Sequence, residues 1–340
     1  MLLLAACSKE EQGEELEKVP PKEDIVEEEE PEEPDEAELM FMSPFTGIMT
    51  EEENLVRPVL ATINNDPLAR PQSGISDADI IYEFLAEGGT TRFLALFQSE
   101  LPEEIGPIRS ARDYFVHMAK GMDAFYVAHG YSPDALALLK SNYIDHVNGM
   151  QYDGTLFKRS KERRAPHNSY ISAENIRTAA EKTNSSMEIA KTSSLSFHDS
   201  VESAKIGDSA QEMVVRYGSQ KNFQSSYSYN EVTGKYDRIV NNIKTIDKAN
   251  EKEVELANVL VFEAIHSTID NVGRQAIDIK SGGRALLFQA GIVKEIKWEN
   301  VNGILTPMEN GASAKLVPGK TWVHIVPVKQ NWETSVTYTP

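Results

Sequence analysis

The feature that most constrains this chain is an acidic, proline-containing segment close to its amino terminus. Residues 9–38 carry 16 Asp and Glu but only 3 Lys, so they supply −13 of the formal net charge of −19. With so few apolar side chains, this segment cannot bury enough surface to offset the entropy lost on folding, and its like charges repel. We therefore expect residues 8–44 to form a disordered acidic tether, with the folded part beginning at Phe45.

The rest of the chain is only mildly acidic, which limits the partners it can have. It holds 37 acidic and 31 basic residues, a net charge of −6. Because no domain is net basic, a general nucleic-acid role is not expected. After Cys7, no apolar run approaches the roughly 18 residues of a membrane-spanning helix, so none is predicted.

The only cysteine, Cys7, directly follows Leu4, Ala5 and Ala6. This order matches the bacterial lipobox, in which the thiol receives a diacylglycerol and the mature chain starts at the Cys. A secretory signal also needs a positive start and roughly 7–15 apolar residues, but only residues 1–6 precede this Cys. We interpret residues 1–7 as a partial signal peptide with a lipobox, and expect the complete leader to begin upstream. A chance cysteine in an apolar terminus is the alternative.

Alternating strands and helices predict an α/β domain over residues 45–190. Four apolar segments are expected to be strands: residues 57–63, 79–85, 91–97 and 124–128. Three helices are expected, over residues 110–121 and from the hydroxyl N-caps Ser132 and Ser172. In the first helix, apolar residues recur at i, i+3, i+4 and i+7, which gives it one apolar face.

Beyond a polar linker at 183–200, residues 196–330 predict a β-rich (α+β) second domain with antiparallel strands. Glycines separate its apolar segments, and residues 248–257 could form a short helix. The expected strands are residues 213–217, 235–240, 259–265, 285–288, 292–298 and 322–326.

Polar residues that could bind a ligand gather around the first expected hairpin and the helix after it. Glu83, Glu87 and Arg92 belong to the hairpin, and Arg109 and Arg112 stand at the mouth of the helix. Free N–H groups at a helix start favour an anion, and two guanidiniums beside them suit a phosphate or a carboxylate. Structural ion pairs between these arginines and the nearby carboxylates are the alternative.

A second polar group follows a buried strand and an extended loop. His129 stands where the strand at 124–128 ends, and ligands bind at the carboxyl ends of strands in α/β folds. Arg164, His167 and Asn168 occupy a basic loop that could close over an anion held by Arg109 and Arg112. The alternatives are a turn histidine bonded to a carbonyl and a solvated basic loop.

No standard catalytic, metal or cofactor motif occurs in this sequence. No two of the seven histidines lie within four residues of each other, so no zinc cluster is expected. Gly130-Tyr131-Ser132 is followed by Pro133, so the Gly-x-Ser-x-Gly nucleophile motif is absent. We therefore predict no catalytic residue, no metal and no cofactor.

Several motifs in order resemble the YerB-like lipoproteins of Gram-positive bacteria, over residues 45–328. They are Ala-Arg-Pro-Gln-Ser-Gly at 69–74, Ala-Asp-Ile-Ile-Tyr-Glu at 78–83, Glu-Gly-Gly-Thr-Thr-Arg-Phe at 87–93, Ile-Gly-Pro-Ile-Arg-Ser-Ala-Arg at 105–112, Ala-Pro-His-Asn at 165–168, Gly-Arg at 273–274, Phe-Gln-Ala-Gly at 288–291, Trp298 and Pro-Gly-Lys-Thr-Trp at 318–322. The resemblance implies a surface-anchored protein of two domains, with no established catalytic residues.

Two functional hypotheses follow, and the first is favoured. In the first, the lipid on Cys7 holds the protein at the extracytoplasmic face of the cell membrane. There it acts as a binding or adaptor protein for an envelope protein or an anionic cell-wall ligand, with cell-wall synthesis machinery as one candidate. In the second, it is an enzyme that acts on an anionic, phosphate-bearing envelope substrate through its Arg, His and Glu residues.

Overall fold

The computed structural model describes residues 40–54, 56–188, 195–328 and 332–340. The partial signal peptide, Cys7 and residues 8–39 of the expected tether lie outside the described residues. Regular structure is present before Phe45, because β1 (Phe41–Met42) pairs antiparallel with β2 (Met49–Thr50). Residues 40–340 form one compact unit.

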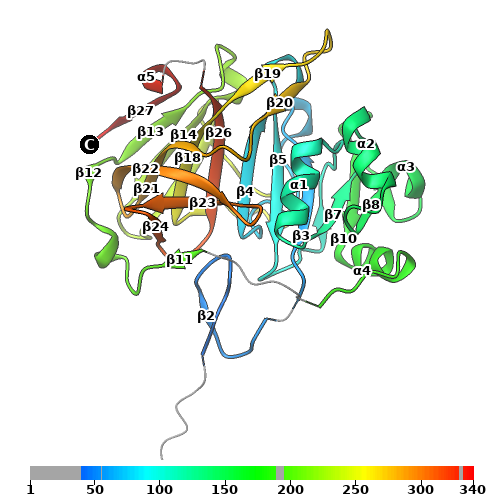
Figure 1. Cartoon of the computed structure of the whole chain (residues 1–340), viewed down its shortest axis with the longest axis horizontal. Coiled ribbons are helices and arrows are strands. Elements are labelled where there is room, and N and C mark those ends of the chain that lie inside the picture. Colours follow the sequence, from blue (N-terminus) through cyan, green and yellow to red (C-terminus); the bar gives the residue numbers. More distant parts are fainter. Residues whose placement is uncertain (1–39, 55, 189–194, 329–331) are drawn as a thin grey trace, which may run out of the picture. The chain divides into compact units, whose positions relative to one another are not determined.

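A twelve-stranded sheet runs through this unit and combines strands from both halves of the chain (Figure 1). Its order is β24 (Ala312–Ser313), β23 (Ile304–Glu309), β22 (Ile292–Val301), β21 (Gly283–Gln289), β18 (Asn258–Ala264), β26 (Thr321–Pro327), β4 (Ile80–Leu85), β5 (Thr91–Phe97), β3 (Val59–Asn64), β7 (Phe125–Ala128) and β8 (His146–Asn148), with β12 (Asp208–Ser209) paired to β22.

Most of the central strands run in the same direction. β18 pairs parallel with β26, and β26 pairs parallel with β4. On the other side of the antiparallel β5, strand β3 pairs parallel with β7 and β7 with β8. The carboxyl ends of these six strands therefore lie at one edge of the sheet.

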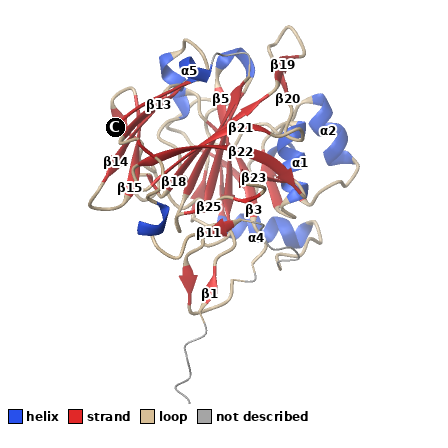
Figure 2. Ribbon diagram, turned by 60° about the vertical axis from the view of Figure 1, so that its left-hand side comes forward, coloured by secondary structure: helices blue, strands red, loops and turns tan. Residues whose placement is uncertain are grey.

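The sheet is buried on both faces, so its central strands are largely apolar, with a few buried polar residues among them. In β5, Leu94 and Leu96 join one core cluster while Phe93 and Phe97 join the other, as the alternation of a strand requires. Helices α1 (Asp113–Gly121) and α2 (Pro133–Lys140) cover the first face. Helix α4 (Ala173–Lys182) and two smaller sheets cover the second. Figure 2 shows α1, α2 and α4 on the side of the molecule where β3 lies.

The remaining elements are short. One small sheet consists of β6 (Glu104–Ile105), β10 (Ser169–Ser172) and β9 (Phe157–Arg159), and another of β16 (Ile243–Lys244), β15 (Lys235–Val240), β14 (Ser225–Asn230), β13 (Glu212–Val215) and β27 (Val336–Thr339), with β17 (Glu255–Leu256) paired to β15. Two strand pairs are β11 (Ser196–Phe197) with β25 (Lys315–Leu316) and β19 (His266–Thr268) with β20 (Gln275–Ile277). The short helices are α3 (Gly149–Tyr152) and α5 (Trp332–Ser335).

The expected fold class is confirmed: all but one of the described α-helices lie before residue 190, and strands dominate after residue 195. Three local expectations were wrong. Helix α1 begins at Asp113 rather than Ser110, because the preceding residues are bonded to strand ends. Residues 248–257 form turns and β17, not a helix. The later strands are not all antiparallel, since β18 and β26 run parallel. The domain boundaries at 45–190 and 196–330 stay predictions.

Candidate functional site

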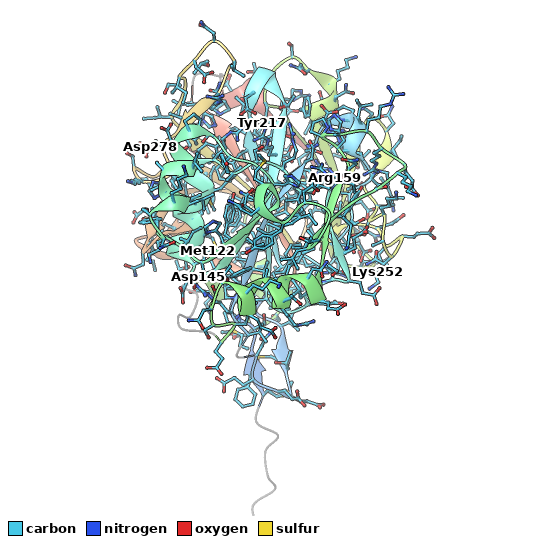
Figure 3. All side chains as sticks on the ribbon, turned by 90° about the vertical axis from the view of Figure 1, so that its right-hand side faces the viewer. Met122, Asp145, Arg159, Tyr217, Lys252 and Asp278 are labelled. Atoms are coloured by element: carbon cyan, nitrogen blue, oxygen red, sulfur yellow. The ribbon has the colours of Figure 1, made fainter. Side chains whose placement is uncertain are left out.

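The carboxyl ends of three parallel strands gather several of the predicted polar residues. β3 ends at Asn64, β7 at Ala128 and β8 at Asn148. His129 therefore lies at the edge of the sheet where α/β folds bind ligands. Figure 3 looks onto the helical side of the molecule and marks Arg159, which contacts His129.

An extended segment, residues 106–112, crosses this edge and carries Arg109. The Arg109 N–H donates to the carbonyl of Thr62 at the end of β3, over 2.8 Å. The Arg109 carbonyl accepts from the His129 N–H just after β7, over 2.9 Å. The backbone of Arg109 is thus held between the ends of two strands, so its position does not depend on its side chain.

Arg92 and Arg112 share one carboxylate, that of Glu87. Arg92 Nη2 lies 2.7 Å from Glu87 Oε2, and Arg112 Nη2 contacts Glu87 Oε1. The two arginine side chains are 7% and 8% exposed, and burial lowers the pKa of both guanidiniums. This group is positive by one charge, since two cations face one anion.

Arg109 differs from these two arginines because its side chain has no partner among the described residues. Its Nε is buried and makes no hydrogen bond. Burial, and then the nearby Arg92, lower the pKa of Arg109 to about 10, although Asp66 opposes the shift. A guanidinium in this setting retains its charge at neutral pH and has donors free for an anion.

The tautomer of His129 follows from its partners. Arg159 Nη2 lies 3.0 Å from His129 Nε2, and a guanidinium can only donate, so Nε2 accepts. His129 Nδ1 therefore carries the proton and donates to Ser169 Oγ over 2.7 Å. Burial and the charge of Arg159 lower the pKa of His129, so the ring is neutral at neutral pH. The lone pair that a general base would use is already occupied by Arg159.

Of the three candidate residues in the basic loop, Asn168 and His167 contact residues at this edge of the sheet, and Arg164 does not. Asn168 Oδ1 accepts from Arg159 Nη1 over 3.0 Å, and His167 Nδ1 lies 2.9 Å from Asn64 Nδ2. Arg164 is exposed, and its side chain makes no hydrogen bond or ion pair to any residue that the structure describes. We call Arg109, His129, Arg159, His167 and Asn168 the strand-end cluster.

From the sequence we expected Glu83 and Glu87 to lie close together beside the arginines. In the structure, Glu83 instead lies on the other face of the sheet. Phe84 is the cross-strand partner of Arg92, whereas Glu83 is the partner of Phe93. Because neighbouring residues of a strand point to opposite faces, Glu83 and Arg92 are separated by the sheet. The nine candidate residues therefore do not form one site.

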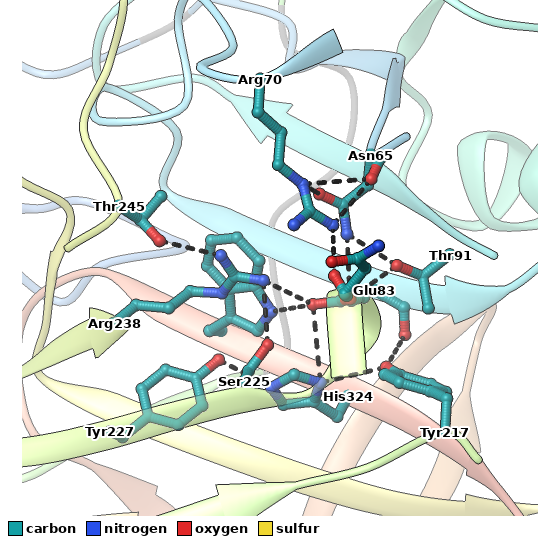
Figure 4. Close-up of polar contacts among 12 residues, drawn as sticks. Asn65, Arg70, Glu83, Thr91, Tyr217, Ser225, Tyr227, Arg238, Thr245 and His324 are labelled. Atoms are coloured by element: carbon teal, nitrogen blue, oxygen red, sulfur yellow. Dashed lines mark hydrogen bonds and ion pairs between the residues drawn. The ribbon is translucent and has the colours of Figure 1, made fainter. Parts of the chain in front are cut away.

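Glu83 is the centre of a buried polar network in which no carboxylate oxygen is left unpaired (Figure 4). Its Oε1 accepts from Thr91 Oγ1 at 2.7 Å, and its Oε2 accepts from Trp322 Nε1 at 3.1 Å and Arg238 Nη2 at 3.3 Å. His324 Nδ1 lies 3.6 Å from the same Oε2. Burial lowers the pKa of His324 to about 4, so this histidine is neutral.

Known proteins match the chain along most of its length. Residues 45–186 match the N-terminal domain, and residues 213–323 the C-terminal domain, of a family described as "Protein of unknown function (DUF3048)". The chain belongs to the DUF3048 family. The resemblance to YerB-like proteins is confirmed by "Putative lipoprotein YerB" of Bacillus subtilis (strain 168), which is 43% identical over 296 residues, 86% of this chain and 88% of the relative.

A solved crystal structure has the same fold. The crystal structure of the YerB protein from Bacillus subtilis matches with a TM-score of 0.81 at 41% identity. The match covers 88% of this chain and 100% of that one. The resemblance therefore extends to the arrangement of both parts of the chain.

Sequence reasoning missed the part of the Glu83 network that comes from the second half of this DUF3048 chain. Arg238 and His324 were not candidates, although His324 is a polar residue in a largely apolar strand and Arg238 lies on the inward face of β15. A polar residue on the inward face of a buried strand needs a partner. The position of His324 in its strand therefore predicts that its ring is hydrogen-bonded, but it does not predict that Glu83 lies nearby.

Two further observations bear on the chemistry of this DUF3048 protein. Among the described residues, no group of three or more His, Cys, Asp and Glu side chains could hold a metal ion. Within the same residues, no helix has the length and apolar character needed to cross a membrane.

Proposed function

We propose that this protein is a lipid-anchored lipoprotein of the cell envelope and acts there as a binding or adaptor protein. In this proposal the strand-end cluster holds an anionic group of an envelope protein or a cell-wall ligand. Cell-wall synthesis machinery is the candidate partner. The anchor would be the lipid on Cys7, which would hold residues 40–340 at the extracytoplasmic face of the cell membrane.

The observation that carries the binding proposal is the unpartnered side chain of Arg109. Its backbone is fixed by Thr62 and His129, and its buried Nε has no acceptor. A buried donor without a partner costs about 1–3 kcal/mol, and an incoming carboxylate or phosphate would remove that cost. Arg92 and Arg112, which share Glu87, add further positive charge.

Binding is favoured over catalysis because the one well-placed histidine is not free to act as a base. The His129 Nε2 lone pair accepts from Arg159, and burial lowers the pKa of the ring. A general base must reach the proton that it removes, and this lone pair points at a guanidinium.

The binding proposal is tested by replacing Arg109 in the full chain. Arg109→Ala should weaken retention on a phosphate-bearing cell-wall preparation, and cross-linking to envelope proteins in cells, by about 1–3 kcal/mol. Stability should hardly change, because the side chain has no partner to lose. Arg216→Ala serves as the matched control, because Arg216 is a partly exposed arginine just after β13 whose side chain donates, among the described residues, only to Thr337. Normal binding per folded molecule in Arg109→Ala would contradict the proposal.

The anchor is tested separately, with a complete secretory signal in front of residue 1. Cys7→Ala should release the protein from the membrane fraction or leave it unprocessed, and should abolish lipid labelling. The neighbouring Ser8→Ala variant should behave as the parent does. Equal membrane association and labelling in Cys7→Ala would remove the anchor from the proposal. The lipobox and the description of the Bacillus subtilis relative as a lipoprotein support it.

A further inference from the structure

A cavity lies between the loop after β3 and the β15–β16 hairpin, and no residue of the strand-end cluster lines it. Its volume is about 320 Å³, within the range of small-molecule sites. Arg70, Pro67 and Pro71 line it from the first half of the chain, and Arg238, Val240 and Ile243 from the second. The cavity thus requires both halves of the fold.

Arg238 supplies a buried cation to this cavity. Its Nη1 donates to Thr245 Oγ1 at 2.9 Å, and its Nη2 reaches Ser225 Oγ at 2.9 Å and Glu83 Oε2 at 3.3 Å. The side chain is only 3% exposed, and its buried Nε has no hydrogen-bond partner among the described residues. A buried donor without a partner, in a residue that lines a cavity, favours binding of a hydrogen-bond acceptor there.

Arg70 supplies a second cation. Its Nε and Nη2 donate to Asn65, and Nη2 also donates to the carbonyl of Asn222, so Nη1 makes no hydrogen bond to the described residues. No carboxylate of the described chain pairs with Arg70 within ion-pair distance. Figure 4 shows the guanidiniums of Arg70 and Arg238 both directed toward Glu83. Glu83 is therefore paired with only one of the two cations, Arg238, and the same carboxylate also binds Trp322 and Thr91.

The remaining wall is apolar or already bonded. Val240, Ile243 and Ile246 form the apolar side, and Ile243 is 71% exposed. Gln72 donates to the carbonyl of Asn64, and Thr245 accepts from Arg238. Few free groups are left to pair with a peptide backbone, so the free chemistry consists of two guanidiniums beside an apolar wall.

We propose that this cavity binds a small amphiphilic anion, with its carboxylate or phosphate on Arg238 and Arg70 and its alkyl chain against Val240 and Ile243. Charge complementarity selects the head group, because the unpaired donors are cationic. The exposed isoleucines select an apolar chain, because covering them removes apolar surface from water. This site is independent of the strand-end cluster and of the proposed adaptor role.

To test the proposal, the full chain is titrated with sodium octanoate and, separately, with octyl phosphate. Binding is measured by calorimetry and by tryptophan fluorescence. Trp322 is a useful reporter because the Arg238 guanidinium carbon lies 4.2 Å from its ring centroid. Octanol lacks the charge and inorganic phosphate lacks the chain, so each should bind about tenfold more weakly or worse. The tighter of the two alkyl anions identifies the head group.

Variants locate the binding. Arg70→Gln should weaken both alkyl anions about tenfold, and Ile243→Ser about threefold, in line with one charged hydrogen bond and a partly covered side chain. Arg216→Gln and Ile206→Ser, at exposed or partly exposed positions elsewhere, are the matched controls and should not change binding. Arg238→Lys should also weaken binding. If that variant fails to fold, Arg70→Gln and Ile243→Ser are sufficient to test the proposal.

Two results would overturn the proposal. One is no binding of either alkyl anion, and binding of an apolar tripeptide with a free carboxylate in that case would point to a peptide ligand instead. The other is binding that neither Arg70→Gln nor Ile243→Ser affects. The variants leave Arg109 intact, so failure here would not bear on the strand-end cluster.

Discussion

At the scale of single residues, side chains of the same type have different roles in different surroundings. Arg92 and Arg112 are neutralised in part by Glu87, whereas no described residue accepts a hydrogen bond from the Arg109 side chain. Glu83 and Glu87 are only four positions apart, yet Glu83 is fully buried and Glu87 is partly exposed. Their surroundings, and not their residue type, decide whether they contribute to stability or to a site.

Glu83→Gln should destabilise the fold strongly. The amide removes the negative charge that faces the buried guanidinium of Arg238, 3.3 Å away. Removing one partner of a buried ion pair costs about 3–5 kcal/mol, because the other charge stays buried and uncompensated. Urea unfolding of the variant measures the loss. Glu299→Gln, at an exposed position, should stay within about 0.5 kcal/mol of the parent. A near-neutral Glu83→Gln would show that Arg238 finds another partner or is hydrated.

Buried histidines predict a loss of stability in weak acid. Burial lowers the pKa of His266 and of His324 from 6.5 to about 4 in the folded protein. Below pH 6.5 the unfolded chain therefore binds protons that the folded chain does not, and stability falls as the pH falls. Each histidine contributes a loss of about 2 kcal/mol between pH 6.5 and pH 5. Urea unfolding at several pH values should show this loss, and His266→Gln should reduce the slope. A flat profile from pH 7 to pH 5 would contradict it.

At the scale of elements, a close approach between helix α1 and the β22–β23 turn joins the two halves. Gly121 ends α1, and a Cβ on it would lie 2.3 Å from the carbonyl oxygen of Gly303. A Cβ on Gly303 would lie 2.2 Å from the Cα of Gly121. Since both obstacles are backbone atoms, neither can move aside without shifting its element.

Gly121→Ala should therefore destabilise, although alanine is the better helix former. Helix propensity favours alanine by at most about 1 kcal/mol, and less at a helix end. Overpacking against backbone costs about 1–3 kcal/mol, so the steric effect should prevail. Thermal unfolding of the variant measures the difference, with Lys120→Ala on the exposed face of the same helix as control. A rise in melting temperature for Gly121→Ala would show that the two backbones separate easily.

Local patterns in the sequence predicted elements well and their partners poorly. Alternation and turn residues located β4, β5 and the N-cap of α2, whose Ser132 Oγ accepts from the Ala135 N–H. The start of α1 was wrong because backbone bonds to β3 and β7 override the helical periodicity there. Arg109 and His129 were found because both flank a predicted element. Arg238 pairs with a residue 155 positions away, and nothing in the local pattern of either strand specifies that pairing.

At the scale of the whole molecule, the two family domains share one sheet. β26, from the end of the chain, lies between β18 and β4, and its residues Thr321 to Ile325 are in parallel register with Ile80 to Phe84. The Glu83 network crosses the same junction, since Trp322, Arg238 and His324 all come from the second half. The division of the sequence into two domains therefore does not coincide with a division of the core.

This shared sheet predicts that neither half folds alone. Residues 40–188 without β26 would expose β4 as a long apolar edge and would leave Glu83 without Arg238 and Trp322. Unpaired apolar edges promote aggregation, and the carboxylate would lose buried partners. Expressed separately, residues 40–188 and 195–340 should be insoluble or give poorly dispersed NMR spectra. Expressed together, they should co-purify in equal amounts, because the β4–β26 pairing restores both the sheet and the network. A well-dispersed spectrum and cooperative unfolding of residues 40–188 alone would instead show a first domain that is stable without β26, and the junction would then be an interface between independent domains.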